Sequence, residues 1–161
     1  MAPADANGTY PLPYFGYGTL LGAGHMRERY PSAASLGLAT YEGHELDFLR
    51  YDSADKGGCS IAERRGARLI GVLYTLSNED MDRLLAVGGD AEWYEARKID
   101  VKMNDGRIAK AITLRVNGAR GPWVPPAAYG RLITEGAVEA NLPADYRANL
   151  NAIVAEAQRG R

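Results

Sequence analysis

The segment that most restricts how this chain can fold covers residues 14–20, where two aromatic residues lead into a turn that contains Gly16 and Gly18. The pattern predicts a short strand, a glycine turn and then a helix. Backbone N–H groups at such a turn and in the first turn of a helix have no partner within the helix, so they can hold a carboxylate or a phosphate. Glycine also lets a ligand approach the main chain. We therefore expect an anion-binding turn.

A dinucleotide-binding loop is the main alternative for this segment, and the spacing argues against it. The glycines stand at Gly16, Gly18 and Gly22, one residue out of register for G-x-G-x-x-G. No strand-helix-strand unit follows the turn, although that motif requires one. The sequence therefore does not predict a Rossmann-type cofactor site.

Composition narrows the class of partner. The chain has 161 residues, which suits one domain, and its 19 basic and 20 acidic residues give a formal net charge of −1. This charge balance does not predict the basic surface that binds nucleic acids or anionic membranes. The sequence also contains no run of about 18 apolar residues, the length that a bilayer-spanning helix needs. We expect no nucleic acid, no membrane, and a small carboxylated metabolite as ligand.

The single cysteine, Cys59, and the two histidines, His25 and His44, show no spacing that brings metal ligands together, so no metal site is predicted. Cys59 cannot form an internal disulfide, and residues 1–13 lack the basic start and apolar run of a secretory signal. These features favour a cytoplasmic location. Burial as a small apolar side chain is the simplest interpretation of Cys59, while a Cys-His nucleophile pair stays open.

Periodicity and turn residues predict an α+β domain over residues 14–161, preceded by a flexible leader at residues 1–13. The expected strands lie at residues 44–51 and 67–76 and in a hairpin of residues 99–103 and 108–116, joined by Asn104-Asp105-Gly106. The expected helices lie at residues 78–87, where Ser77 begins a capping box, at 126–137, and from Pro143 onward. No regular alternation of strand and helix is present.

Several short motifs occur in a fixed order along the chain. They are Phe15-Gly16-Tyr17-Gly18-Thr19-Leu20, Pro31-Ser32-Ala33-Ala34, Leu46-Asp47-Phe48, Gly57-Gly58, Gly71-Val72-Leu73-Tyr74, residues 129–136, and Asn141-Leu142-Pro143 with Tyr146. In this order they resemble the landmarks of the gamma-glutamylcyclotransferase-like family, which includes AIG2-like proteins and gamma-glutamylamine cyclotransferases. The resemblance covers about residues 14–152.

The resemblance implies a small mixed β-barrel of five to six strands with flanking helices. It also implies transferase- or lyase-type chemistry without a cofactor, in which the α-amine of a γ-glutamyl amide attacks its own γ-carbonyl, forms 5-oxoproline and releases an amine. Because the nucleophile is tethered, effective molarity supplies much of the acceleration. A monomer and a homodimer are both compatible with the sequence.

A positioned carboxylate must take the proton of the α-ammonium group before the amine can attack. The family supplies a Glu just before a Gly at the end of the central helix, several residues ahead of a Tyr. If Gly89 and Tyr94 match that glycine and tyrosine, Gly88 stands in the place of the glutamate. The candidate replacement bases are Asp90 and Glu92, nearest in sequence, and Glu135, which stands before Gly136.

The resemblance also suggests substrate-binding residues. These are Gly16, Tyr17, Gly18, Thr19 and Leu20 at the turn, together with Gly88, Tyr94 and Tyr129. The Thr19 hydroxyl is expected either to cap the following helix or to contact the ligand. Two alternatives to cyclotransferase activity stay open, namely a divergent member with amidase- or decarboxylase-like chemistry and a carboxylate-binding module without catalysis.

Overall fold

The computed structural model describes residues 8–52, 56–86 and 93–160. The elements follow the chain in this order: β1 (Tyr14–Gly16), α1 (Ala23–Arg29), β2 (Ala34–Arg50), β3 (Gly57–Thr75), α2 (Asn78–Leu85), β4 (Tyr94–Met103), β5 (Ile108–Val116), α3 (Ala127–Glu139) and α4 (Ala144–Gln158). This order confirms the predicted succession of a strand, a helix, further strands, a helix, a hairpin and two helices.

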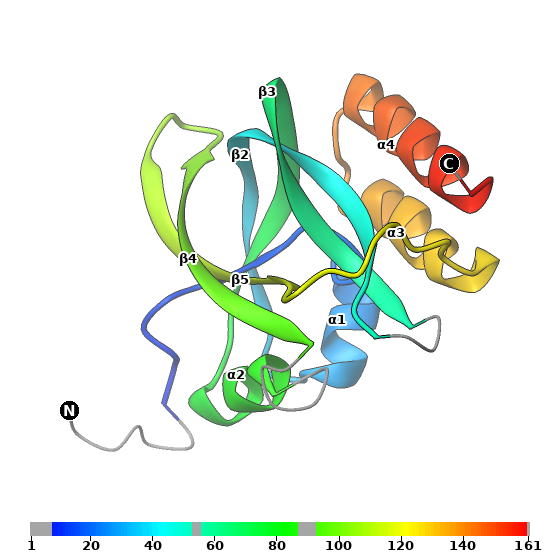
Figure 1. Cartoon of the computed structure of the whole chain (residues 1–161). Helices are drawn as coiled ribbons and strands as arrows, with labels where there is room; N and C mark the ends of the chain where they lie inside the picture. The colour runs from blue at the N-terminus through cyan, green and yellow to red at the C-terminus, as the bar shows by residue number, and fades with distance from the viewer. Residues whose placement is uncertain (1–7, 53–55, 87–92, 161) are drawn as a thin grey trace.

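The five strands close into a mixed barrel in the order β1-β3-β2-β4-β5. All neighbouring strands are antiparallel except β1 and β5, which are parallel. Figure 1 shows α3 and α4 packed together on one side of the barrel, with α1 and α2 near one end. The barrel with its flanking helices confirms the predicted α+β fold class.

The short strand β1 is held in the centre of the fold. Phe15 is fully buried and lies opposite Leu73 of β3. Gly71 makes this packing possible, because a Cβ there would lie 2.5 Å from the Gly16 carbonyl oxygen and 2.8 Å from the Phe15 ring. Full burial of such an aromatic side chain stabilises the fold by roughly 1.5–3 kcal/mol.

The two long strands differ most from the prediction. β2 begins at Ala34 rather than at residue 44, and β3 begins at Gly57 rather than at residue 67. Glycines with positive φ at Gly37, Gly43 and Gly66 interrupt the apolar alternation, yet the cross-strand ladder continues past two register shifts in β2. Gly57-Gly58 falls in the gap predicted between two strands, but in the structure it begins β3.

The other predicted elements are present with shifted ends. The hairpin turns at Gly106, whose φ is +89°, and its first strand begins at Tyr94 instead of residue 99. Ser77 caps α2 by accepting a hydrogen bond from the Asp80 amide (3.1 Å). The helix predicted over residues 78–87 is α2, which ends at Leu85, and residue 87 lies outside the described residues.

Part of the segment predicted as a leader pairs with the domain. The Tyr10 amide donates to the Leu76 carbonyl (2.8 Å), and the Asn78 amide donates to the Gly8 carbonyl (2.7 Å). Residues 1–7 lie outside the described residues. None of the helices in the described ranges combines the length and the hydropathy that crossing a bilayer requires.

Candidate functional site

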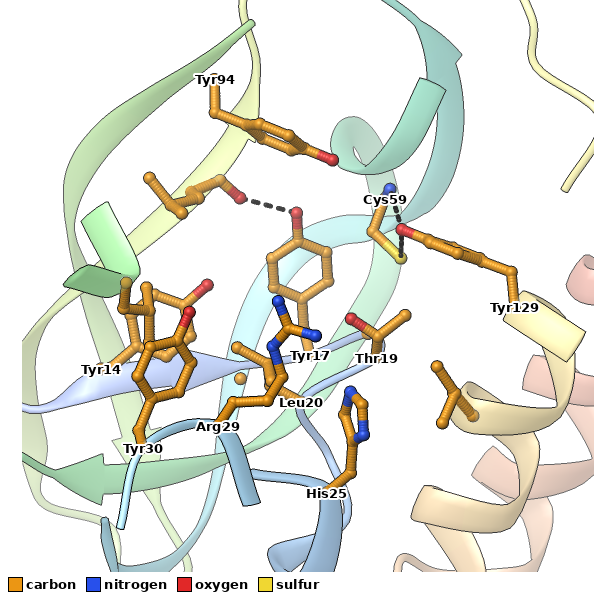
Figure 2. Close-up of a pocket in the computed structure, with 15 residues that line it drawn as sticks. Tyr14, Tyr17, Thr19, Leu20, His25, Arg29, Tyr30, Cys59, Tyr94 and Tyr129 are labelled. Atoms are coloured by element: carbon orange, nitrogen blue, oxygen red, sulfur yellow. Dashed lines mark hydrogen bonds between the residues drawn. The ribbon is translucent and has the colours of Figure 1, made fainter. Parts of the chain in front are cut away.

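The glycine turn after β1 lines a cavity of about 310 Å³ (Figure 2). Other elements contribute to the same cavity: α1 through His25 and Arg29, β3 through Cys59, α2 through Leu84, and β4 through Tyr94. The turn, strands β3 and β4, and helices α1 and α2 therefore meet at one place, although their residues lie far apart in sequence.

The two glycines of the turn are required by contacts within the protein. A Cβ on Gly16 would lie 2.9 Å from the Leu20 carbonyl oxygen, and a Cβ on Gly18 would lie 2.5 Å from the Cys59 sulfur. Neither glycine has a positive φ. Close approach of Leu20 and Cys59 therefore explains both glycines, and the approach of a ligand to the main chain stays a prediction.

The amides that can bind an anion belong to the turn rather than to the helix. In the described part of the chain, the Gly18 and Leu20 amides have no protein acceptor. The Gly24 amide in the first turn of α1 instead donates to the Glu139 carboxylate (2.7 Å). The N-cap of α1 is Gly22, so the expectation that Thr19 caps this helix is wrong. A ligand carboxylate can still accept hydrogen bonds from the unpaired Gly18 and Leu20 N–H groups of the turn.

A cluster of hydroxyl and thiol groups forms the deeper wall. The Tyr129 hydroxyl accepts a hydrogen bond from the Cys59 amide (2.9 Å) and donates one to the Cys59 sulfur (3.3 Å). The Tyr17 hydroxyl donates to the Leu114 carbonyl (2.7 Å). The Tyr94 hydroxyl lies against Gly58, where any Cβ would collide with it. Gly58 therefore allows Tyr94 to reach Cys59 and Tyr129.

These groups are uncharged at neutral pH. Burial raises the pKa of the Cys59 thiol to about 11, although hydrogen bonds from Tyr129 and from the Thr19 backbone act in the opposite direction. Burial also raises the pKa values of Tyr17, Tyr94 and Tyr129 well above the ordinary range. A thiol with so high a pKa contains little thiolate, which makes Cys59 a poor nucleophile.

Charge in the cavity comes from one helix. Arg29 of α1 is the charged side chain among the described lining residues, and no described carboxylate lines the cavity. His25, one helical turn before Arg29, has a pKa below its ordinary 6.5 because of desolvation and then because of the Arg29 charge. The described residues also contain no group of three or more His, Cys, Asp or Glu that could hold a metal ion.

The structure brings most of the predicted binding residues together. Those that line the cavity are Gly16, Tyr17, Gly18, Thr19, Leu20, Tyr94 and Tyr129. Glu135 does not join them, because it is exposed and borders a groove between α3 and α4. Gly88, Asp90 and Glu92 lie outside the described residues.

Sequence reasoning did not assign His25, Arg29 or Cys59 to this site. From the sequence, the histidines are weighed only as metal ligands or as partners of Cys59 in a nucleophile pair, although the i, i+4 spacing of His25 and Arg29 directly after the glycine turn places both on one helix face. Cys59 directly follows Gly57-Gly58, a family landmark. These two patterns were the available signals.

Comparisons with known proteins agree with the geometry. A family model described as Gamma-glutamyl cyclotransferase, AIG2-like, matches residues 14–136. A gamma-glutamylcyclotransferase of Bos taurus is 25% identical over 155 residues, which cover 92% of this chain and 81% of the relative. A solved gamma-glutamyl cyclotransferase structure shares 26% identity with a TM-score of 0.79, covering 88% of this chain and 87% of the other.

A second solved structure is similar to the same extent. It is an uncharacterized protein from Homo sapiens with 26% identity and a TM-score of 0.78, covering 88% of this chain and 87% of the other. The residues matched by the family model include the whole glycine turn and both Tyr94 and Tyr129.

Proposed function

Since this chain belongs to the gamma-glutamyl cyclotransferase, AIG2-like family, we propose that it is an enzyme that converts a small γ-glutamyl amide into 5-oxoproline and an amine. The observation that carries the proposal is the position of the glycine turn at a cavity of about 310 Å³ together with Tyr94 and Tyr129. That volume lies at the lower end of the range of small-molecule sites.

In this proposal the substrate's α-carboxylate binds the Gly18 and Leu20 amides of the turn. The γ-glutamyl chain then extends toward the buried hydroxyl groups, and its own α-amine closes on the γ-carbonyl carbon. The uncharged Tyr94 hydroxyl suits donation to the carbonyl of the substrate. The Tyr129 hydroxyl already donates to the Cys59 sulfur, so it suits accepting a hydrogen bond from the amide of the substrate. Holding the amine near the carbonyl supplies effective molarity, so the protein has little covalent chemistry to add.

Asp90 and Glu92 remain proposed bases. The described residues on either side of their segment, Leu84 and Tyr94, both line the cavity. The variants Asp90→Asn and Glu92→Gln test them, since loss of the base lowers the rate by about 10²–10⁴. Glu135→Gln is the matched control, because that carboxylate borders the groove between α3 and α4.

The test of the proposed function is direct. The purified protein is incubated with a panel of γ-glutamyl amines and γ-glutamyl amino acids, and 5-oxoproline is measured against an active family member. We expect 5-oxoproline and the free amine in equal amounts from at least one substrate. Absence of product from the whole panel contradicts the proposal.

A second function is supported by the absence of a carboxylate among the described lining residues. A cavity that binds a carboxylated metabolite without cyclising it, or that carries amidase- or decarboxylase-like chemistry, needs the turn but not the family's glutamate. The variant Gly88→Glu separates these functions. If the parent is inactive and Gly88→Glu forms 5-oxoproline, the pocket holds a γ-glutamyl substrate and lacks only the base.

A further inference from the structure

His25 and Arg29 share the face of α1 that borders the cavity. They are separated by one helical turn, and both line the cavity together with the glycine turn. Figure 2 shows the His25 ring rising from α1 toward Thr19, and the Arg29 side chain rising toward Tyr17. His25 is partly buried, and no protein partner binds its ring nitrogens in the described part of the chain. The imidazole is therefore open to a ligand.

The end of α1 is fixed to the end of α2. The Arg83 guanidinium of α2 donates to the Arg29 carbonyl (2.7 Å) and lies 5.4 Å from the centre of the Tyr30 ring. Leu84, the next residue of α2, lines the cavity. The family resemblance places its catalytic glutamate at the end of this central helix. α1 therefore approaches the cavity beside the place from which the family supplies its base.

The chemical state of the lining groups points to one proton acceptor. The tyrosines and Cys59 hold their protons at neutral pH, and Arg29 is always cationic. His25 is the described lining side chain that is neutral and has a free lone pair at pH 7, since desolvation and Arg29 lower its pKa while Glu28 opposes the shift. Glu139 of α3 is engaged with the Gly24 amide, next to His25.

We propose, on the premise of the proposed cyclotransferase reaction, that His25 is the catalytic base that takes a proton from the α-ammonium group of the γ-glutamyl substrate. The freed amine forms a bond to the γ-carbonyl carbon, and the bond from that carbon to the leaving nitrogen breaks. Protonated His25 returns its proton to the leaving nitrogen. The attacking nitrogen, now part of the 5-oxoproline ring, loses a second proton, which also ends on the released amine. The amine therefore leaves as an ammonium ion, and no oxidant or co-reactant is needed.

The energetics favour an imidazole in this role. An α-amino group has an ordinary pKa of about 7.7–8.0, an imidazole about 6.5 and a glutamate about 4.3. Between groups with these ordinary pKa values, proton transfer from the substrate is less uphill to an imidazole than to a carboxylate, and the lowered pKa of His25 reduces this difference. A base also works best when its pKa lies near the working pH. Gly88 in the place of the family's glutamate is compatible with catalysis if His25 acts as the base.

The decisive variant is His25→Gln, with His44→Gln as the matched control. His44 is the other histidine of the chain, and its ring stacks on Tyr41 in a separate cavity, with ring centres 3.8 Å apart. For a substrate that the parent converts, we expect His25→Gln to lower kcat about 100-fold with little change in KM. His44→Gln should stay within about twofold of the parent. Added imidazole should restore part of the activity of His25→Ala.

The pH profile of kcat/KM separates a catalytic role of His25 from a merely structural one. In the parent, kcat/KM should fall on the acid side as His25 becomes protonated, and this acid limb should disappear in His25→Gln. Arg29→Met should move the limb to higher pH, because removal of the neighbouring positive charge raises the pKa of His25. This second variant leaves His25 itself intact.

The outcomes are distinguishable. If the parent forms 5-oxoproline and His25→Gln keeps its rate and its acid limb, the inference about His25 is overturned while the proposed function stands. Loss of the acid limb in Asp90→Asn or Glu92→Gln instead of His25→Gln also overturns it. If the parent forms no 5-oxoproline from any γ-glutamyl substrate, the proposed function fails, and the assignment of His25 fails with it.

Discussion

The sulfur of Cys59 fills the place that a side chain on Gly18 would occupy. A Cβ on Gly18 would lie 2.5 Å from the sulfur and 3.1 Å from the Cβ of Cys59. The glycine turn is thus seated on the start of β3, a strand that lies far from it in sequence. The position of the Gly18 and Leu20 amides, which are proposed to bind the substrate's carboxylate, depends on this contact.

Gly18→Ala should therefore destabilise the protein. Overpacking of this kind costs about 1–3 kcal/mol in the free energy of unfolding. The cost should be smaller in a Cys59→Ala background, because the closest atom is then absent. Denaturant unfolding of both single variants and the double variant measures this coupling, and simply additive costs would contradict it.

The Cys59 thiol should react slowly with disulfide reagents. Burial raises its pKa from 9.0 to about 11, so the thiolate fraction near pH 8 is about 100-fold below that of the unfolded chain. The buried thiol supports stability below about pH 9, and this contribution is lost as the pH rises through about 11. We expect the rate to rise up to about pH 11, and a plateau below pH 10 would contradict the assignment. Tyr129→Phe removes a hydrogen bond that lowers this pKa, so it should shift the profile upward.

Asp80 links α2 to the segment after α1. Its carboxylate accepts hydrogen bonds from the Ser32 amide (2.9 Å), the Ser32 hydroxyl (2.5 Å) and Arg83 (2.7 Å). Desolvation opposes ionisation, but these contacts keep the pKa below 3.8. Its stabilisation is therefore present above about pH 3.8 and is lost on further acidification. Asp80→Asn should lower the free energy of unfolding at pH 7 by about 1–3 kcal/mol, whereas Asp82→Asn on the exposed face of α2 should have little effect.

Gly136→Ala should displace α1. A Cβ at this position of α3 would lie 2.9 Å from the Gly22 nitrogen and 3.3 Å from the Leu21 Cβ. We expect a loss of about 1–3 kcal/mol in unfolding free energy and weaker binding of 5-oxoproline, since α1 carries His25 and Arg29. Val138→Ala, at an exposed position of the same helix, is the control. Unchanged 5-oxoproline affinity in Gly136→Ala, measured by calorimetry, would show that α1 has not moved.

Local patterns in the sequence predict the elements whose signals are short-range. Asn104-Asp105-Gly106 predicts the hairpin because Gly106 accepts a positive φ, and Ser77 predicts the start of α2 because its hydroxyl caps the Asp80 amide. The ordered family motifs predict the barrel. The hairpin and cap signals lie within a few residues of the structure that they determine, whereas the family motifs act through their order along the whole domain.

The parts that were not predicted depend on contacts between distant segments. β2 continues through Gly37 because β3 supplies its hydrogen bonds across the register shift. The role of Gly18 follows from Cys59. The exposure of His25 to the cavity follows from the orientation of α1, which contacts with Gly136, Glu139 and Arg83 hold in place. No single stretch of sequence contains this information.

The barrel is closed by unequal seams. β2 and β3 pair along nearly their whole lengths, whereas in the described strands β2 meets β4 only at Ala39-Met103 and Thr40-Lys102, and β1 meets β5 at Tyr14-Ile112. The β4-β5 hairpin is held internally by a long ladder. Besides the short edges, single hydrogen bonds from Tyr17 to Leu114, from Thr113 to Phe15 and from Val116 to Ser60 join it to the rest of the fold. We expect this unit to detach in partial openings before the whole chain unfolds, because few contacts join it to the other strands. In amide hydrogen exchange, the seam amides should exchange through this opening while the β2-β3 ladder stays protected. Because Tyr94 and Leu114 stand in the wall of the cavity, opening of this hairpin also opens the cavity. We therefore expect the lifetime of the closed cavity to be set by the attachments of the hairpin rather than by the stability of the whole chain.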